Sequence, residues 1–470
     1  MVIGSGPNGL AGAIVLAEAG YAVELHEAEA TIGGGMRTAE LTLPGFRHDL
    51  CSAVHPLGRG SPFFRRLSLD VDWIEPPIAV AHPFDDGTAV ALERDVDSTA
   101  ARLGPDAAAY RRLVQPFVER YGVVEPLLLG AFPPRPSDVA GAVGALGPRA
   151  LGRGLRTAFD SARRVAESRF RTERARGLFA GLAAHAILPL ERRPSAGFGL
   201  ALAVLGHAVG WPSPRGGSQA IADALAERLR SLGGEIRTSS PVDELPRADV
   251  VLADVMPCEL VRLARGRFPL GYERALRAYR HGPGAFKLDW ALAGPLPWRA
   301  AECRQAGVIH LGSTLDEISR WEWGAWSGAV GRRPFVLLGQ QSLFDPTRAP
   351  EGKHTAWAYC HVPNASEVDL TAGVEAQVER FAPGFRDLIL ARSALGPRAL
   401  QEHDRNLVGG DVAGGAMDLG QLFFRPARRL VPYRTPLAGV YICSAATPPG
   451  GGVHGMCGVS AAAVALKDRR

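Results

Sequence analysis

The chain has 470 residues, of which 46% are hydrophobic and 21% are charged, and its mean hydropathy is close to zero. These values indicate a protein with a large buried core, organised as two domains or as one large domain with an inserted cap. The net charge of +5 comes mainly from arginine. Because the arginines are scattered rather than aligned with aromatic residues, we expect no nucleic-acid partner.

The six cysteines are widely separated and no pair has CxxC spacing, which argues against a zinc site, a redox dithiol and a disulfide framework, so no metal site is predicted. The longest apolar stretches, 177–190 and 196–211, are shorter than a membrane span, and no secretory signal is visible. We therefore expect a cytoplasmic protein. An arginine-rich segment, 163–176, is read as a solvated helix face, but a peripheral contact with an anionic membrane stays open, as does an oligomer.

The first 30 residues have the pattern of a β-α-β unit. Residues 1–3 predict a strand and residues 10–19 a helix that Gly20 ends. Alternating apolar residues then predict a second strand over 21–27. The first strand is unusually short, so either the strand is trimmed or the start of the sequence lies a few residues too late.

The turn of this unit carries the motif Gly4-x-Gly6-x-x-Gly9, with Pro7 and Asn8 inside it, and Glu27 ends the second strand. Gly4 permits the tight turn, Gly6 permits close approach of a pyrophosphate, and Gly9 permits close packing of helix and sheet. The amides at the helix start favour an anion, and an acid at the position of Glu27 suits a ribose hydroxyl. This combination predicts a dinucleotide site.

Two further glycine-rich segments point to the same site. In Gly33-Gly34-Gly35-Met36-Arg37-Thr38, a guanidinium that follows a flexible turn can pair with a diphosphate. At the C-terminal end, a strand over 439–444, a Pro/Gly loop and a helix over 458–466 would direct a second helix start at the cofactor. Such a helix dipole favours the negative charge that a reduced flavin carries.

Between these segments, residues 98–210 predict mainly helix, and Gly216–Ser218 lead into a helix over 221–232. Strands are expected at 235–242, 248–253, 285–292, 334–339 and 355–361. No second strand–GxGxxG–helix unit is visible, so we expect no separate NAD(P)H domain. Dioxygen, a quinone or another protein is then the expected electron partner.

Together with segments 45–57, 284–292 and 421–426, the three motifs resemble the phytoene desaturase-related FAD oxidoreductases, the carotenoid and retinoid oxidoreductase family. The resemblance is greatest to the branch typified by pyridine nucleotide-disulfide oxidoreductase domain-containing protein 2. It implies an α/β fold in which a Rossmann-type FAD-binding domain is built from discontinuous segments, 1–78, 214–262 and 405–470. An inserted α+β substrate domain with a helical cap would occupy 79–213 and 263–404.

The resemblance also implies which residues bind FAD: Gly4, Gly6, Pro7, Asn8, Gly9, Glu27, Ala28, Gly34, Gly35, Met36, Arg37, Thr38, Val242, Ser444, Gly452, Val453 and His454. Val242 would contact the adenine side through its backbone, and residues 452–454 would lie beside the isoalloxazine. The sequence departs from many related flavoenzymes after the last strand, where Ser444-Ala445-Ala446 replaces an expected acidic residue.

Hydride transfer to a flavin depends mainly on positioning, so the sequence need not show an acid or a base. His454 is the first candidate catalytic residue and His55 the second, with Asp49 beside it. For each, a structural role is the alternative, and Cys457 is expected to be a buried inert thiol. The segments 122–132 and 196–211 could line a tunnel for a long hydrophobic substrate, or simply pack in the core.

The sequence therefore predicts an FAD-dependent oxidoreductase, a dehydrogenase, desaturase or oxidase, that moves a hydride between the flavin and an apolar, lipid-like or polyene-like small molecule. Two alternatives stay open. One is a flavin amine oxidase, which shares the FAD architecture but for which no C-terminal aromatic pair is visible. The other is an FAD-bearing protein with a regulatory role and no catalysis.

Overall fold

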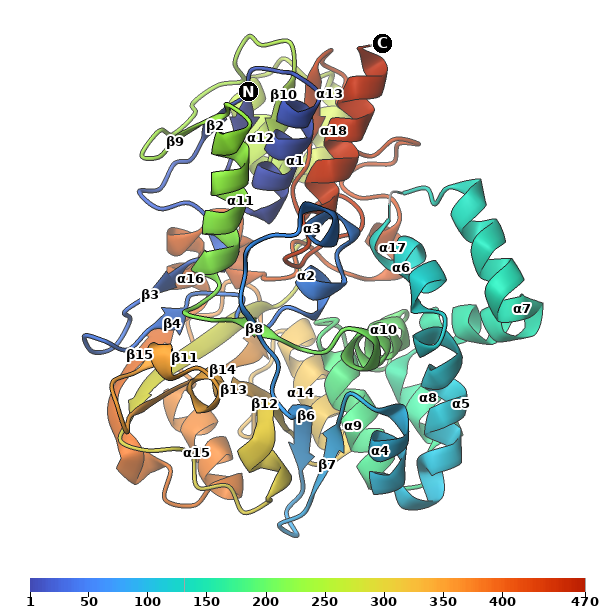
Figure 1. Ribbon diagram of the computed structural model, residues 1–470, viewed down its shortest axis with the longest axis vertical. Coiled ribbons are helices and arrows are strands. Elements are labelled where there is room, and N and C mark those ends of the chain that lie inside the picture. Colours follow the sequence, from blue (N-terminus) through green and yellow to red (C-terminus); the bar gives the residue numbers. More distant parts are fainter. Residues whose placement is uncertain (131, 470) are drawn as a thin grey trace.

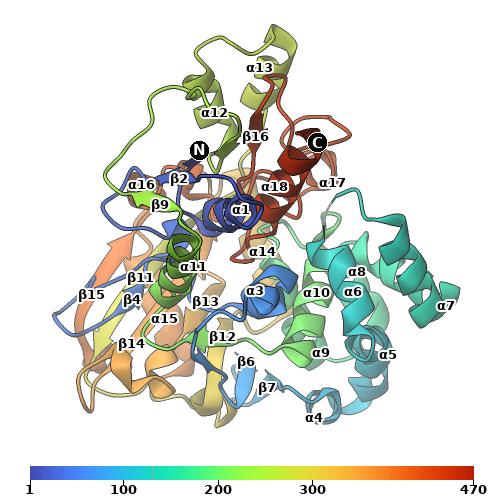
Figure 2. The same ribbon diagram turned by 45° about the horizontal axis from the view of Figure 1, so that its top comes forward.

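The computed structural model describes residues 1–130 and 132–469, and it contains two main sheets in two connected regions (Figures 1 and 2). The first sheet is parallel, with the strand order β16-β10-β1-β2-β9. Its strands come from the beginning, middle and end of the chain: β1 (Val2–Ile3), β2 (Glu24–His26), β9 (Glu235–Arg237), β10 (Val251–Ala253) and β16 (Val440–Ile442). The predicted Rossmann-type domain built from discontinuous segments is confirmed.

Helices cover both faces of this parallel sheet. Alternate strand residues point to opposite sides, and those on both sides are apolar, so each face needs a cover of helices. Val2, Leu25 and Leu252 belong to the apolar cluster beneath one set of helices, namely α1 (Pro7–Glu18), α11 (Gln219–Ser231) and α18 (Met456–Asp468). Ile3 and Val251 belong to the cluster on the other side, formed with α12 (Pro257–Ala264) and α13 (Leu270–Arg277). The result is a three-layer α/β domain.

The boundaries of the first β-α-β unit follow from local chemistry. Pro7 occupies the first turn of α1, where a missing N–H costs nothing. Gly20 ends the helix as predicted, with a φ of +87° that a glycine adopts without strain. β2 is shorter than expected, beginning at Glu24 rather than Tyr21, because its neighbours β1 and β9 offer only two and three residues for pairing.

The second sheet is mixed, with the order β15-β11-β14-β13-β12-β6-β7, in which β6 and β12 are parallel. Its strands are β6 (Ile78–Pro83), β7 (Ala89–Leu92), β11 (Gly284–Leu292), β12 (Ala306–Leu311), β13 (Val336–Gly339), β14 (His354–Val362) and β15 (Ile389–Leu395). β11, β13 and β14 match predicted strands closely. The others were not predicted: β6 and β7 are buried on both faces and lack alternation, and β15 is an edge strand that contains Arg392.

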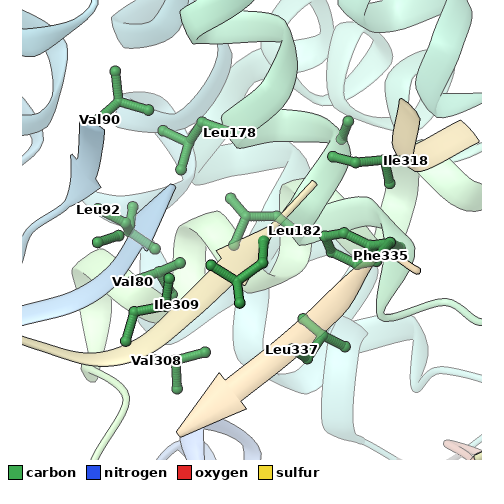
Figure 3. Packing of buried hydrophobic residues seen from close by; sticks show 14 of the residues in the cluster. Val80, Val90, Leu92, Leu178, Leu182, Val308, Ile309, Ile318, Phe335 and Leu337 are labelled. Atoms are coloured by element: carbon green, nitrogen blue, oxygen red, sulfur yellow. The ribbon is translucent and has the colours of Figure 1, made fainter. Parts of the chain in front are cut away.

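The predicted helical stretch from about residue 98 to 210 is confirmed, and it forms a cap beside the mixed sheet (Figure 1). Its helices are α4 (Val96–Arg102), α5 (Ala107–Val118), α6 (Tyr121–Leu129), α7 (Pro136–Ala158), α8 (Ala162–Arg169), α9 (Glu173–Ala184) and α10 (Ser195–Ala208). Figure 3 shows how the cap joins the sheet: Leu178 and Leu182 of α9 lie among side chains of β6, β12 and β13, including Val80, Ile309 and Leu337.

The remaining elements connect the two regions or cover the sheets. They are the ribbons β3 (Thr38–Ala39) with β4 (His48–Asp49) and β5 (Trp73–Ile74) with β8 (Ser213–Pro214), and the helices α2 (Pro56–Gly60), α3 (Pro62–Leu67), α14 (Leu315–Ser327), α15 (Thr371–Phe381), α16 (Pro397–His403) and α17 (Leu419–Leu422).

One predicted domain limit needs correction. The limit after residue 262 falls inside α12, and α13 also packs on the parallel sheet through Tyr272 and Leu276. The region built on the parallel sheet therefore continues about one helix further along the chain than the sequence suggested.

Candidate functional site

A cavity of about 740 Å³ runs from the glycine-rich loop of the parallel sheet to the mixed sheet and the helical cap. One half is lined by the turn after β1, the end of β2 and the loops after β10 and β16. The other half is lined mainly by apolar side chains of the cap and of the mixed sheet. The cavity thus joins a polar half beside the glycine turn to an apolar chamber.

The glycine-rich turn has the geometry of an anion site. Gly4 has a φ of +94°, and a Cβ atom on Gly9 would lie 2.0 Å from the Gly4 carbonyl oxygen, so both positions require glycine. α1 begins with no side-chain cap and no acidic residue in its first turn. Pro7 has no N–H and the Gly9 amide is bonded to Asp254, so the start of α1 presents the amides of Gly6 and Asn8 and the positive end of the helix dipole to the cavity.

Glu27 lies on the cavity wall directly after β2, as predicted. Its carboxylate accepts hydrogen bonds from the amides of Ser5 and Glu29, both at 2.9 Å, so the loop itself fixes its orientation. Val242 lines the same end, and its carbonyl oxygen accepts a hydrogen bond from Arg262 at 3.2 Å. These residues enclose the end of the cavity that suits a ribose and an adenine.

Arg37 lies on the cavity wall with 5% of its surface exposed. Its guanidinium donates to the carbonyl oxygens of Gly34 (3.0 Å) and His403 (2.6 Å) and forms no ion pair with any described residue. A buried cation without a carboxylate partner is costly unless an anion pairs with it. The position next to the start of α1 fits the diphosphate of a dinucleotide.

A second helix start converges on the cavity from the C-terminal segment. A Cβ atom on Gly458 of α18 would lie 1.8 Å from the Asn8 carbonyl oxygen, so glycine lets α18 pack directly against α1. Ser444, Gly452 and Val453 line the cavity ahead of α18. The start of α18 lies directly behind this loop, where its first amide donates to His454 Nδ1 at 3.0 Å, and the positive end of α18 adds to that of α1 beside the cavity.

Two acidic residues in the polar half escaped the sequence analysis. Asp254 follows β10 and accepts a hydrogen bond from the Gly9 amide at 2.8 Å. Burial raises the pKa of Asp254 to about 8 against the opposing hydrogen bond from Gly9, with a smaller contribution from the field of Asp404, and burial raises the pKa of Asp404 as well. At neutral pH a protonated Asp254 can donate a hydrogen bond to a phosphate instead of repelling it. A carboxyl directly after a parallel strand, beside the glycine turn, was the available signal.

Not every residue predicted to bind the nucleotide reaches the cavity. Gly9, Met36 and Thr38 do not line it. Met36 is fully buried in the core beneath α1, and the Thr38 hydroxyl donates to Asp49 at 2.7 Å. Gly9 packs against the Gly4 carbonyl group on the side of the turn away from the cavity. The other predicted positions lie on the cavity wall, including Gly4, Gly6, Pro7, Asn8, Ala28, Gly34 and Gly35.

His454 lies on the cavity wall, but both of its ring nitrogens are engaged within its own loop. Nδ1 accepts from the Met456 amide at 3.0 Å, and Nε2 donates to the Gly450 carbonyl oxygen at 3.2 Å. Burial lowers its pKa to about 4. These contacts correspond to the structural alternative, in which His454 shapes the loop rather than transferring a proton.

His55 also lines the cavity and differs from His454 in keeping one nitrogen free. The Ser218 hydroxyl donates to the Ser52 carbonyl oxygen at 2.6 Å, so His55 Nε2 must donate to Ser218, at 2.8 Å. Its Nδ1 then carries a lone pair without a partner among the described residues. Burial lowers the pKa of His55 to about 4, which keeps the ring neutral.

Asp49 and Cys457 have structural surroundings. Asp49 accepts from Thr38, from the Ser218 amide (2.8 Å) and from Arg348 (2.8 Å), and the arginine helps hold its pKa below the usual range against burial. Cys457 is fully buried and off the cavity wall, and burial raises the pKa of its thiol to about 11. Neither group is available for chemistry in the cavity.

The apolar chamber receives residues from both segments that were predicted to line a tunnel. The first segment contributes residues 127–130 and Phe132, and the second contributes Phe198, Ala201, Leu202, Leu205 and Trp211. The mixed sheet and the end of α9 add polar groups that were not predicted. Among them are Lys287 of β11, which pairs with buried Asp289, Tyr359 of β14, and His185 at the end of α9.

The parallel sheet, the glycine turn and the cavity shared with a second, mixed sheet give the chain the fold of the two-domain flavin-type oxidoreductases. A family model described as an NAD(P)-binding Rossmann-like domain matches residues 2–67. Pyridine nucleotide-disulfide oxidoreductase domain-containing protein 2 of Mus musculus is 27% identical over all of this chain and 93% of its own length. The mouse protein and, over about half of the chain, several phytoene dehydrogenases and desaturases are among its homologues.

Two further matches show a partial likeness in sequence and a likeness in fold. Phytoene dehydrogenase of Streptomyces griseus is 28% identical over 47% of this chain and 43% of its own length. The solved structure of putrescine oxidase bound to putrescine has a TM-score of 0.63 at 15% identity, covering 99% of this chain and 97% of that one. The second match concerns the fold alone.

Proposed function

We propose that the chain binds FAD in the polar half of the cavity and transfers a hydride between the flavin and a neutral, apolar molecule held in the chamber. The observation that carries this proposal is the buried guanidinium of Arg37, which forms no ion pair with the described residues, beside the start of α1. Both features supply positive potential where a diphosphate would lie. When bound, the flavin supplies a hydride donor or acceptor.

The protein's own residues supply binding, orientation and exclusion of water. Glu27 is oriented to accept from a ribose hydroxyl, and the starts of α1 and α18 favour negative charge on the phosphates and the reduced ring. The aromatic and aliphatic walls of the chamber would hold the substrate carbon against the ring and keep it dry. Lys287 and the neutral ring of His55 are the polar groups available to orient water or a substrate atom.

The chamber favours a neutral over a cationic substrate. Among the described residues that line the cavity, the acidic ones belong to the nucleotide half or, like Asp411, bind backbone amides. Nothing there would pair with a substrate ammonium. A flavin amine oxidase, suggested by the fold shared with putrescine oxidase, is therefore the second candidate.

The test is to purify the protein, record its visible spectrum, and reconstitute it with FAD if it is colourless. We expect stoichiometric FAD that is released on denaturation, and flavin reduction or reoxidation by apolar neutral compounds. Peroxide formation with amines instead would favour the second candidate. Bound FAD that resists photoreduction and reoxidation would indicate a role without catalysis. A folded protein that does not bind FAD would refute the proposal.

We also propose a peripheral contact between helix α7 and an anionic membrane. In the described residues, no helix is long and apolar enough to cross a bilayer. Figures 1 and 2 show α7 standing out from the side of the cap, and Val139, Val143 and Leu155 on it are more than 40% exposed. Such a contact would bring a lipid-like substrate to the apolar chamber.

A further inference from the structure

A pair of neutral histidines lies at the far end of the apolar chamber. His185 ends α9 and His310 lies on β12, and their Nε2 atoms are 3.1 Å apart. His185 lines the cavity and is partly exposed to it, whereas His310 is fully buried behind it. The aromatic ring of Trp211 stands edge-on to His185, with 5.5 Å between ring centroids.

The fold is shaped to hold this pair. Gly177, Gly181 and His185 recur every four residues and therefore share one face of α9. A Cβ atom on Gly181 would lie 2.6 Å from His310 Nδ1, and one on Gly177 would lie 2.8 Å from His82 Nε2. The two glycines thus let α9 approach the strands that carry His310 and His82, which places His185 over His310 at the cavity.

The hydrogen bonds of the cluster leave nitrogen atoms unpaired. His82 Nε2 donates to the Ser313 carbonyl oxygen at 2.7 Å, but His82 Nδ1 and His310 Nδ1 have no partner among the described residues. His185 Nδ1 forms no hydrogen bond with them either, and it belongs to the one ring of the three on the cavity wall. Unpaired polar atoms in apolar surroundings are costly unless a ligand or water completes them.

The pair is electrically neutral. Burial lowers the pKa of His185 to about 3, helped by the nearby charge of His361, which pairs with Glu322 at 2.8 Å. Burial, followed by the neighbouring histidines, holds the pKa of His310 well below its usual value. A neutral imidazole can donate or accept one hydrogen bond at Nδ1, depending on which Nε2 of the pair carries the shared proton. Because it is neutral, the imidazole of His185 cannot form an ion pair with a carboxylate or an ammonium group.

We propose that His185, backed by His310, is a polar subsite that binds one hydroxyl or carbonyl oxygen of an otherwise apolar substrate. This inference rests on the proposed function and narrows its substrate class. A pure hydrocarbon would leave the His185 nitrogen unpaired, and a charged end group would be desolvated without a counterion. An alcohol or a ketone satisfies the nitrogen at no such cost.

The experiment uses the FAD-saturated protein and calorimetric titration with decane, 1-decanol, 2-decanone, decylamine and decanoate. We expect the alcohol or the ketone to bind about 3- to 10-fold more tightly than the alkane and the charged compounds, the range that one hydrogen bond provides. A preference for the alcohol alone would assign Nδ1 as the acceptor, and a preference for both oxygen compounds would assign it as the donor, because a hydroxyl oxygen also accepts. Equal binding of the alkane would refute the subsite.

Two variants of His185 test whether this residue causes the preference for the oxygen-containing ligands. His185→Phe should abolish the preference for oxygen while keeping alkane affinity, and His185→Gln should retain part of it. His207→Gln is the matched control, because His207 is a buried histidine that bonds Tyr110 away from the cavity. An unchanged preference in His185→Phe would overturn the proposal, and the ligand series on the unmodified protein decides it if the variants do not fold. Failure to bind FAD would instead refute the proposed function.

Discussion

At the scale of single residues, Arg37 should contribute binding energy rather than stability. Because its guanidinium is buried without an acidic partner, the nucleotide-free protein bears the cost of desolvation that a bound diphosphate would offset. We predict that Arg37→Gln weakens FAD binding roughly 10- to 100-fold, equivalent to about 1.5–3 kcal/mol for a charged hydrogen bond, without lowering the melting temperature of the nucleotide-free form. Fluorescence titration with FAD and thermal unfolding measure the two effects.

The matched control is Arg230→Gln, on the exposed surface of α11. It should change neither quantity. If Arg37→Gln bound FAD as tightly as the unmodified protein, the diphosphate would lie elsewhere.

Asp254 should make stability depend on pH in an unusual direction. Its pKa is about 8 in the folded chain against 3.8 for an ordinary aspartate, so between these values the folded chain keeps a proton that the unfolded chain has lost. Stability is therefore lost as the pH rises from about 4 to 8. We predict that Asp254→Asn, which keeps an oxygen for the Gly9 amide, raises the free energy of unfolding at pH 8 by roughly 1–3 kcal/mol and has little effect at pH 4.

Urea unfolding of the nucleotide-free protein at several pH values tests this prediction. Asp243→Asn, at an exposed position, is the control and should leave the pH profile unchanged. A parallel shift of Asp254→Asn at all pH values would show that the carboxyl is ionised in the folded chain throughout.

At the scale of secondary structure, the contact between α1 and α18 decides where both helices point. A Cβ atom on Gly458 would collide with the Asn8 carbonyl group in the glycine turn. We predict that Gly458→Ala weakens FAD binding at least roughly 10-fold and destabilises the protein by about 1–3 kcal/mol, because the helices must separate. Gly271→Ala, in α13 where a Cβ atom meets nothing, should be neutral or slightly stabilising.

The same elements show what a sequence can and cannot predict. The β-α-β unit and the helix after the last strand were predictable because glycine, proline and apolar periodicity act locally. β6 and β7 were not, since strands buried on both faces lose the alternation that identifies them. The same limit applies to the site: Arg37 follows a visible motif, whereas His185 and His310 meet only because α9 packs on β12.

His454 shows a choice that depends on the coordinates. Its place in a conspicuous loop made it a catalytic candidate with a structural role as the alternative, and the loop backbone engages both ring nitrogens. The sequence leaves both roles open because the choice depends on which hydrogen bonds remain free.

At the scale of the whole molecule, the position of α7 links the chamber to the outer surface. Phe132 precedes the helix and Phe159 follows it, and both rings contact Phe423 with centroids 6.0 and 5.7 Å apart. All three side chains line the cavity, and Phe159 is also 40% exposed. The rim of the chamber is therefore apolar and lies at both ends of α7, where a membrane-bound substrate could enter.

The charges of α7 indicate which membrane surface it would meet. Arg149, Arg153 and Arg156 are exposed and form no ion pair with the described residues, and Asp138 is the one acidic residue of the helix. Each arginine near an anionic bilayer contributes about 1 kcal/mol, so the three together correspond to about 100-fold in affinity. Because this attraction is electrostatic, it should weaken as ionic strength rises.

We therefore predict that the protein sediments with vesicles containing anionic lipid but not with neutral vesicles, and that replacing all three arginines of α7 by glutamine reduces this binding at least about 10-fold. The matched control replaces Arg230, Arg247 and Arg332 by glutamine, three exposed arginines away from α7 that are also without ion pairs among the described residues. Equal loss of binding in the control would mean that net charge alone attracts the protein. Absence of binding at every lipid composition would refute the proposed membrane contact. The substrate would then have to reach the chamber from solution.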